Sequence, residues 1–402
     1  MGSSEGWKLR CIGCGRIAST EIPDSRCRKC GDLLEIRISR RIDRQSFYTR
    51  DGPGIWRFAR ALPLPPEAEP VSLEEGGTPL VRTSRLGTKM GLENLYAKND
   101  GQNPTGSFKD RGMTVAVTRA KTLGAQALVC ASTGNTAASL AAYAARAGMK
   151  AVVVVPRAGV ASGKLGQAFA YGAKVFGVEG NFDQALATVF DLVRRDDRFY
   201  LMNSVNPFRI EGQKVTAFEI YEQLTRVPDY VVLPVGNAGN ISAIWKGFLE
   251  MRAWGIINAL PRMIGVQAEG AAPLAQAYSS GKAFSPLKEP HTVASAIRIG
   301  NPVSWKKALN AISESGGKAV VVSDDEIMDM KRKLAQEEGL LVEAASAAPF
   351  AALPRLKLPQ KAEVVCIATG NGLKDLSEHG GDQRIEGVDG PDAIINSIGG
   401  RL

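Results

Sequence analysis

Histidine is nearly absent from this chain, which has 402 residues and only His291 and His379. Histidine supplies many ligands of catalytic zinc sites and the base of Ser-His-Asp triads. So few histidines exclude histidine-rich metal catalysis and leave little for a triad. If the protein is an enzyme, its general base is expected to be another residue type, and a lysine fits.

Long hydrophobic runs are lacking as well. Apolar runs such as residues 151–156 are short and end at Pro or Gly, far below the length that spans a membrane. Residues 1–10 contain no apolar core of a secretory signal. A hydrophobic content of 44% with 23% charged residues is typical of a globular protein of two or three domains. We therefore expect a cytoplasmic protein with no membrane partner.

The positive charge is unevenly distributed. Residues 1–60 contain 13 Lys and Arg against 7 Asp and Glu, and so carry most of the net charge of +9. The remainder of the chain is nearly balanced, so any contact with nucleic acid would lie at the front. A solvated basic face is the simpler explanation, and a nucleic-acid partner is disfavoured.

Four of the six cysteines form the spacing C-x2-C-x12-C-x2-C, and each pair is followed by glycine. This spacing predicts a zinc ribbon in residues 1–40, because tetrahedral zinc accepts four thiolates and so short a segment has few apolar residues to fold unaided. Disulfides are the alternative, which the lack of an export signal disfavours. The expected metal ligands are Cys11, Cys14, Cys27 and Cys30.

After a basic, proline-rich linker at residues 41–70, strand and helix patterns alternate. Apolar runs such as 127–130, 230–234 and 363–368 are separated by amphipathic stretches such as 136–147, 163–171, 210–224 and 241–252. This alternation predicts an α/β fold with two doubly wound parallel sheets. We expect a large domain of residues 71–103 and 196–380, a small domain of residues 104–195, and a C-terminal tail of residues 381–402.

Lys109 is the most informative residue. It lies in the segment 103–112, a turn rich in Gly and Pro at the start of an apolar stretch. A lysine held among backbone amides and away from water loses its proton more readily and can form a Schiff base with an aldehyde. A surface turn that happens to carry a lysine is the ordinary alternative.

Three loops of small residues favour a reactive lysine over an ordinary surface turn, because each loop follows a strand-like run. The loop at residues 235–240 opens a helix with Gly236, Asn237, Ala238, Gly239 and Asn240, a pattern suited to a phosphate, and it lacks the order G-x-G-x-x-G of a dinucleotide site. Residues 132–135 and 368–375 complete the set. Such loops around a reactive lysine predict pyridoxal phosphate as the cofactor.

The other two loops offer hydroxyl and amide groups. Ser132 and Thr133 suit a substrate carboxylate, although helix capping by either side chain uses the same geometry and remains open. Asn135 suits the ring oxygen of the cofactor. Thr369 can offer a hydroxyl to the pyridine nitrogen, which would leave that nitrogen largely unprotonated, and helix capping is again the alternative.

The segment 203–214 predicts the substrate class. Arg209 can bind a phosphate bidentately, with Asn203 and Ser204 completing the cradle. Pairing of Arg209 with a nearby carboxylate such as Glu211 is the alternative.

Taken in order, the segments 75–80, 103–112, 132–135, 203–214, 296–305 and 368–375 resemble those of the threonine synthases, which are fold type II pyridoxal phosphate enzymes similar to the tryptophan synthase β subunit. The resemblance implies that Lys109 is the Schiff-base lysine and that Asn135, 236–240 and Thr369 bind the cofactor. It also implies that Asn203, Ser204 and Arg209 bind the substrate phosphate. The N-terminal cysteine module is no part of the catalytic pattern, and residues 343–348 follow it only loosely and are assigned no site.

The implied reaction is a carbon–oxygen lyase reaction that converts O-phospho-L-homoserine and water into L-threonine and phosphate, in a homodimer that closes around its substrate. Cysteate synthase, phosphoserine sulfhydrylase and threonine dehydratase share the cofactor residues and remain alternatives. Arg209 argues against the dehydratase, whose substrate has no phosphate. From a different class, a nucleic-acid-binding protein with a zinc ribbon and a non-catalytic body also remains.

Overall fold

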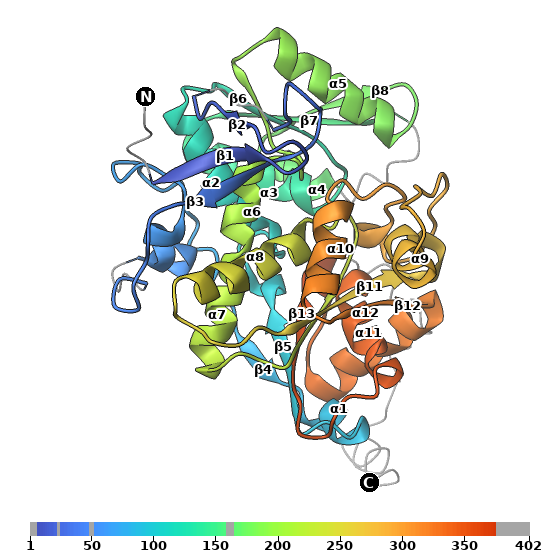
Figure 1. Cartoon of the computed structure of the whole chain (residues 1–402). Helices are drawn as coiled ribbons and strands as arrows, with labels where there is room; N and C mark the ends of the chain where they lie inside the picture. The colour runs from blue at the N-terminus through green and yellow to red at the C-terminus, as the bar shows by residue number, and fades with distance from the viewer. Residues whose placement is uncertain (1–5, 22–24, 48–51, 158–164, 375–402) are drawn as a thin grey trace, which may run out of the picture.

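Three β-sheets organise the chain in the computed structural model, which describes residues 6–21, 25–47, 52–157 and 165–374 (Figure 1). The α/β fold class predicted from the sequence is confirmed. The predicted tail at residues 381–402 lies outside the described residues. No helix in the described ranges combines the length and the apolar character needed to cross a bilayer.

The strands are β1 (Trp7–Cys11), β2 (Ile17–Ala18), β3 (Leu34–Ile38), β4 (Leu80–Arg82), β5 (Asn94–Asn99), β6 (Ala127–Ala131), β7 (Lys150–Pro156), β8 (Lys174–Val178), β9 (Phe199–Leu201), β10 (Tyr230–Pro234), β11 (Arg262–Ala268), β12 (Lys318–Val322) and β13 (Glu363–Ala368). The helices are α1 (Ser84–Lys89), α2 (Lys109–Thr122), α3 (Asn135–Ala147), α4 (Gly166–Ala170), α5 (Phe182–Arg195), α6 (Pro207–Gln213), α7 (Val215–Leu224), α8 (Gly239–Ala253), α9 (Pro273–Ser280), α10 (Trp305–Glu314), α11 (Asp324–Glu338) and α12 (Ala344–Ala351), with a 3-10 helix η1 at Gly54–Ala61 and another, η2, at Asp100–Gln102.

The six-stranded sheet has the order β12-β11-β10-β13-β5-β4 and is parallel except for β4. Successive residues of its strands enter different cores. Val231 and Leu233 pack with residues of α7, α8 and α10, whereas Val232 packs with residues of α1, α11 and α12. Both faces are therefore covered, which explains why these strands read as continuous apolar runs.

The four-stranded sheet has the order β8-β7-β6-β9 and is wholly parallel. Leu128 packs with Leu140 of α3 on one face, and Val129 packs with Val189 of α5 on the other. The division into domains stays a prediction. Because β9 pairs with β6, we propose that the small domain continues to about residue 201 rather than ending at 195.

The linker predicted at residues 41–70 is packed onto the body where it is described. Phe47 and Phe58 form an aromatic cluster with Phe218 of α7 and with Trp254. The N-terminal sheet, in the order β2-β1-β3, contributes Trp7 to the same core. The N-terminal residues therefore share one hydrophobic core with the rest of the described chain.

Two predicted helices differ in their bounds. The stretch 210–224 forms two helices, α6 and α7, that meet at Lys214. Helix α8 approaches closely there, since a Cβ at Gly247 would lie 2.5 Å from the carbonyl oxygen of Lys214. A backbone contact of this kind does not change the periodicity of apolar residues, so the sequence pattern could not predict the break between the two helices. The helix predicted at 163–171 corresponds to the shorter α4, and its residues 163 and 164 lie outside the described ranges.

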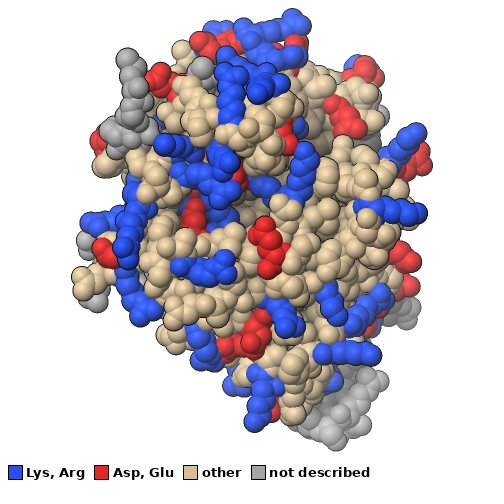
Figure 2. All heavy atoms as spheres, viewed as in Figure 1, with Lys and Arg blue, Asp and Glu red and all other residues tan. Residues whose placement is uncertain are grey.

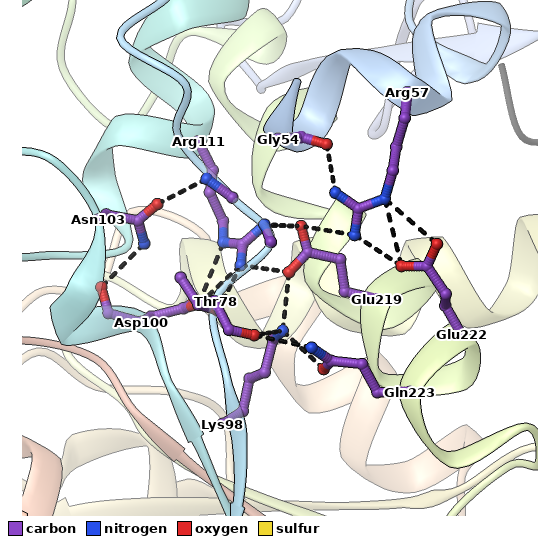
Figure 3. Close-up of polar contacts among 12 residues, drawn as sticks. Gly54, Arg57, Thr78, Lys98, Asp100, Asn103, Arg111, Glu219, Glu222 and Gln223 are labelled. Atoms are coloured by element: carbon purple, nitrogen blue, oxygen red, sulfur yellow. Dashed lines mark hydrogen bonds and ion pairs between the residues drawn. The ribbon is translucent and has the colours of Figure 1, made fainter. Parts of the chain in front are cut away.

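A buried charge network centred on Glu219 joins several of these elements (Figure 3). Its carboxylate accepts hydrogen bonds from Arg111 of α2 (2.7 Å) and from Lys98 of β5 (2.7 Å), and Arg111 also pairs with Asp100 (2.8 Å). Burial alone would raise the pKa of Glu219, but the charges of Arg111 and then Lys98 outweigh it and hold this pKa well below its ordinary range. The network therefore fixes the start of α2 against β5 and α7.

We predict that Glu219→Ala destabilises the protein by roughly 3–5 kcal/mol, because it leaves two buried cations without their shared carboxylate. The matched control is Glu222→Ala, whose partly exposed carboxylate pairs with Arg57 and should contribute about 0–1 kcal/mol. Urea unfolding measures both changes. Since the native pKa of Glu219 is depressed, its contribution is present above the ordinary Glu range and is lost as the pH falls below it. Equal effects of the two substitutions would contradict the prediction.

Candidate active site

Lys109 is the first residue of α2 and directly follows the turn at residues 103–108. Gly106 in this turn has a φ of +77°, a conformation that suits glycine. The amide of Phe108 donates to the carbonyl oxygen of Thr369 (3.0 Å), and Ser107 bridges to Gly370. The turn that carries Lys109 is therefore held against the carboxyl end of β13.

The surroundings of Lys109 favour its neutral amine. Its pKa is lowered to about 7, first by burial and then by the positive charge of Arg209, against the opposing charge of Glu343. Its ammonium nitrogen lies 3.7 Å from the centre of the Phe108 ring. A lysine in this environment is a nucleophile near neutral pH.

Asp110, the next residue, is buried and accepts hydrogen bonds from Thr105 (2.6 Å) and Ser139 of α3 (2.6 Å). Burial raises the pKa of Asp110 to about 6. Its side chain connects the turn to α3 and so helps to hold Lys109 in place.

The loop at residues 236–240 follows β10 and opens α8. Ala238 has a φ of +63°, and no side chain caps the helix. Within the described ranges, the amides of residues 236–240 donate to no protein acceptor. Both polar atoms of the Asn240 side chain are buried without a partner among the described residues. Unsatisfied donors at a helix N-terminus form a site for an anion such as a phosphate.

The loop at residues 132–135 connects β6 to α3. Ser132 and Thr133 are half-buried, and α3 begins at Asn135 with no side-chain cap, so neither residue makes the capping bond left open by the sequence. The side-chain Nδ2 of Asn135 donates to the carboxylate of Glu343 (2.9 Å), and its Oδ1 accepts from Lys374 (2.7 Å). These contacts join the loop after β6 of the four-stranded sheet to residues at the start of α12 and after β13.

Thr369 lies directly after β13 and is buried. Its hydroxyl is 3.0 Å from the hydroxyl of Ser346 in α12, which also accepts from the amide of Gly370 (2.8 Å). Thr369 makes no helix-capping bond among the described residues. Ser346 therefore orients the hydroxyl that the sequence assigns to a pyridine nitrogen.

Arg209 lies in α6 with only 2% of its surface exposed. Its guanidinium donates to the carbonyl oxygen of Met202 (2.9 Å), while its Nε is buried without a partner. No carboxylate among the described residues pairs with it. Glu211, the partner that the sequence offered, pairs instead with Lys214 (2.6 Å) and Lys246. Arg209 thus keeps its capacity to bind an anion.

The two residues expected beside Arg209 differ in their surroundings. The amide of Asn203 exchanges two hydrogen bonds with the backbone of Ala131 (3.0 and 2.9 Å), so it mainly joins the end of β6 to α6. Ser204 is half-buried. The roles assigned to all these residues stay predictions. The charges of Glu343 and Lys374, both hydrogen-bonded to Asn135, act on Lys109, and Arg209 is near enough to lower the pKa of Lys109.

The four cysteines lie apart from this centre, in the turns around β1 and β3. Their sulfur atoms all lie within 4.8 Å of one another, with Cys11 and Cys30 at 3.4 Å and Cys14 and Cys27 at 3.7 Å. A tetrahedral zinc site with bonds of about 2.3 Å spaces its sulfurs similarly. Figure 2 shows Lys and Arg side chains gathered where this module lies, with Asp and Glu among them.

A profile of the pyridoxal-phosphate dependent enzymes matches residues 71–370. The chain belongs to this family. It is 52% identical over 377 residues to threonine synthase from Methanocaldococcus jannaschii. This match covers 91% of this chain and 92% of that protein. It is 50% identical to threonine synthase from Synechocystis sp., over 78% of this chain and 81% of that protein. The resemblance inferred from the motifs is confirmed.

Solved structures of other enzymes share the fold. The processed form of threonine deaminase isoform 2 from Solanum lycopersicum superposes with a TM-score of 0.65 at 23% identity, covering 75% of this chain and 80% of that one. Maize serine racemase superposes with a TM-score of 0.65 at 23% identity, covering 75% of this chain and 89% of that one. The residues present fit the cofactor, since the unpartnered amides and Asn240 suit its phosphate, and Lys109, whose pKa is lowered to about 7, suits its aldehyde.

Sequence reasoning missed four side chains of this site, namely Asp110, Glu343, Ser346 and Lys374. Glu343 and Ser346 lie in the segment 343–348, and their contacts come from residues more than 20 positions away. Lys374 lies in the motif 368–375, so its position in a predicted cofactor loop was the available signal. For Asp110, the available signal was a carboxylate next to the reactive lysine.

We predict that the apoenzyme takes up pyridoxal phosphate at a rate that rises with pH through about 7, because the neutral amine of Lys109 is the reactive form. Arg209→Gln should move this midpoint upward, since it removes a positive charge that lowers the pKa. The control, Arg262→Gln, changes an exposed arginine at the opposite end of the parallel strands and should leave the midpoint unchanged. Stopped-flow absorbance measures the rates. A midpoint near 10 in the wild type would contradict the assignment.

Proposed function

We propose that this chain is a pyridoxal-phosphate-dependent threonine synthase, a lyase that converts O-phospho-L-homoserine and water into L-threonine and phosphate. The observation that carries the proposal is the near full-length identity of 52% to a threonine synthase. The geometry supports it, because a lysine with a pKa of about 7 lies near an arginine that has no carboxylate partner among the described residues. A substrate with both an amine and a phosphate suits that pair.

The cofactor would be held at both ends. The amides of residues 236–240 and the side chain of Asn240 would receive its phosphate, and Lys109 would hold its aldehyde carbon. Asn135 would face the ring hydroxyl, and Thr369, oriented by Ser346, the ring nitrogen. When bound, the cofactor withdraws electrons from the α carbon of the substrate and so stabilises the charge left by proton removal.

The protein side chains would position the substrate and move its protons. The amine of Lys109 would take a proton from the α carbon and one from the β carbon, and it would return protons to the γ and α carbons as water adds its hydroxyl to the β carbon. Ser132 and Thr133 would bind the α carboxylate. Arg209, with Ser204, would hold the phosphate as it leaves from the γ carbon, and Asn203 would keep this cradle joined to β6.

We propose three further properties that the resemblance to threonine synthase supports. The four thiolates would bind one structural zinc ion, as their mutual distances suggest. The enzyme would be a homodimer, which sedimentation can test. It would act in the cytoplasm.

Product analysis tests the reaction directly. Incubation with O-phospho-L-homoserine should release phosphate and threonine in equal amounts, and Lys109→Ala should lower turnover by at least about 10²–10⁴-fold and abolish the visible cofactor absorbance. Lys121→Ala, an exposed lysine on the same helix, is the control and should retain both. Phosphate release from phosphoserine with sulfite, but not from phosphohomoserine, would favour the alternative cysteate synthase.

Arg209→Ala should raise KM for the phosphorylated substrate roughly 10- to 100-fold, because a charge-assisted hydrogen bond to phosphate is lost. Cofactor absorbance should be unchanged. Arg194→Ala, an exposed arginine on α5, provides the control. Loss of the cofactor rather than of substrate affinity would show that Arg209 has a different role.

A further inference from the structure

The N-terminal ribbon touches the helix that carries Arg209. Trp7 of β1 is completely buried, and its ring meets the ring of Phe208 edge to face, with centroids 5.5 Å apart and planes at 88°. Phe208 directly precedes Arg209 in α6. A side chain of the four-cysteine module therefore contacts the residue next to the proposed phosphate ligand.

Arg119 reinforces this contact. Its guanidinium lies 5.7 Å from the ring of Trp7 and 5.5 Å from the ring of Phe208, and it donates to the carbonyl oxygen of Thr20 in the ribbon (2.5 Å). Arg119 belongs to α2, the helix that begins with Lys109. A cation stacked on two aromatic rings thus joins the ribbon, α2 and α6 in one buried cluster.

On its other side, α6 packs tightly against α2. A Cβ at Gly212 would lie 1.8 Å from the carbonyl oxygen of Arg111, so the backbones of α6 and α2 are in contact. Helix α6 is only seven residues long and is held between α2 and the ribbon. Its position, and that of any side chain it carries, therefore depends on both contacts.

Arg209 is especially sensitive to this position, because no carboxylate among the described residues holds its guanidinium. Among the described residues, it donates a hydrogen bond to the carbonyl oxygen of Met202, just before α6. An arginine with a carboxylate partner would be oriented by that partner. Arg209 is instead directed by the backbone from which it projects.

The ribbon also contacts the four-stranded sheet and two helices, α8 and α10, that pack on the six-stranded sheet. Leu33 packs in the core of the small domain with Val129 and Val205, whereas Asp32 pairs with Lys306 of α10 (2.6 Å). Lys246 of α8 donates to the carbonyl oxygen of Ile36 in β3 (2.5 Å). The module therefore contacts elements on either side of residues 201–206, the segment that connects the four-stranded sheet to α6.

We propose that the ribbon positions Arg209 for the substrate phosphate, with Trp7 as a positioning residue that acts through Phe208. This inference rests on the proposed function, because it takes Arg209 as the phosphate ligand. It assigns the ribbon a role in substrate affinity, where the sequence left nucleic-acid binding, subunit contact and terminal bracing open.

The test compares variants of the full-length holoenzyme. Trp7→Ala should raise KM for phosphohomoserine about tenfold while kcat changes less than about twofold and the cofactor absorbance is unchanged, because a small displacement of a binding group lowers affinity. Trp7→Phe, which keeps an aromatic edge, should restore most of the affinity. Leu9→Ala removes a buried side chain from the same face of β1 and controls for general weakening of the ribbon. It should leave KM within about twofold.

Calorimetry with inorganic phosphate gives a readout that does not need turnover. The Kd should rise about tenfold in Trp7→Ala. If Arg209→Ala binds phosphate as the wild type does, the assignment of Arg209 fails. If Arg209→Ala weakens binding but Trp7→Ala does not, or if Leu9→Ala has the same effect as Trp7→Ala, the positioning role is refuted while the proposed function stands. Should Trp7→Ala not fold, Trp7→Leu carries the same comparison.

Discussion

Helices α2 and α6 cross at Gly112 and Gly212 with no space for a side chain between them. A Cβ at Gly112 would lie 2.6 Å from the carbonyl oxygen of Arg209, and one at Gly212 would lie 1.8 Å from that of Arg111. Because the two backbones touch, Lys109 at the start of α2 and Arg209 in α6 belong to one rigid unit. The lowered pKa of the lysine follows in part from that proximity.

Ion pairs around this unit leave Arg209 without a carboxylate partner among the described residues. On the far side of α2, Arg111 is neutralised by Glu219 and Asp100. Beside α6, Lys214 and Lys246 occupy the carboxylate of Glu211 and so keep it from Arg209. The buried carboxylates of Glu219 and Glu211 are thus paired within the scaffold, and Arg209 keeps its positive potential near Lys109. Low local polarity strengthens that potential compared with a surface arginine.

Much of the fold and part of the site could be predicted from local pattern. Strands such as β10 and β13 were predicted because both faces of their sheet are covered, which makes them continuously apolar. The break at Lys214 could not, because it reflects the approach of Gly247 from α8. Among site residues, Lys109 and the loop at 236–240 lie in short motifs with a local physical meaning. Glu343 and Ser346 gain their meaning only from contacts with Asn135 and Thr369.

The sequence alone revealed the reactive groups, namely a lysine in a constrained turn, amide-rich loops after strands, an arginine in the segment 203–214 and four cysteines at metal spacing. These features depend on residue type and near neighbours, and both are visible along the chain. The folded chain was needed to show that Glu211 pairs with lysines instead of Arg209, that Ser346 orients Thr369, and that the ribbon packs against Phe208. Such choices depend on which distant segments meet, and packing of the whole chain sets them.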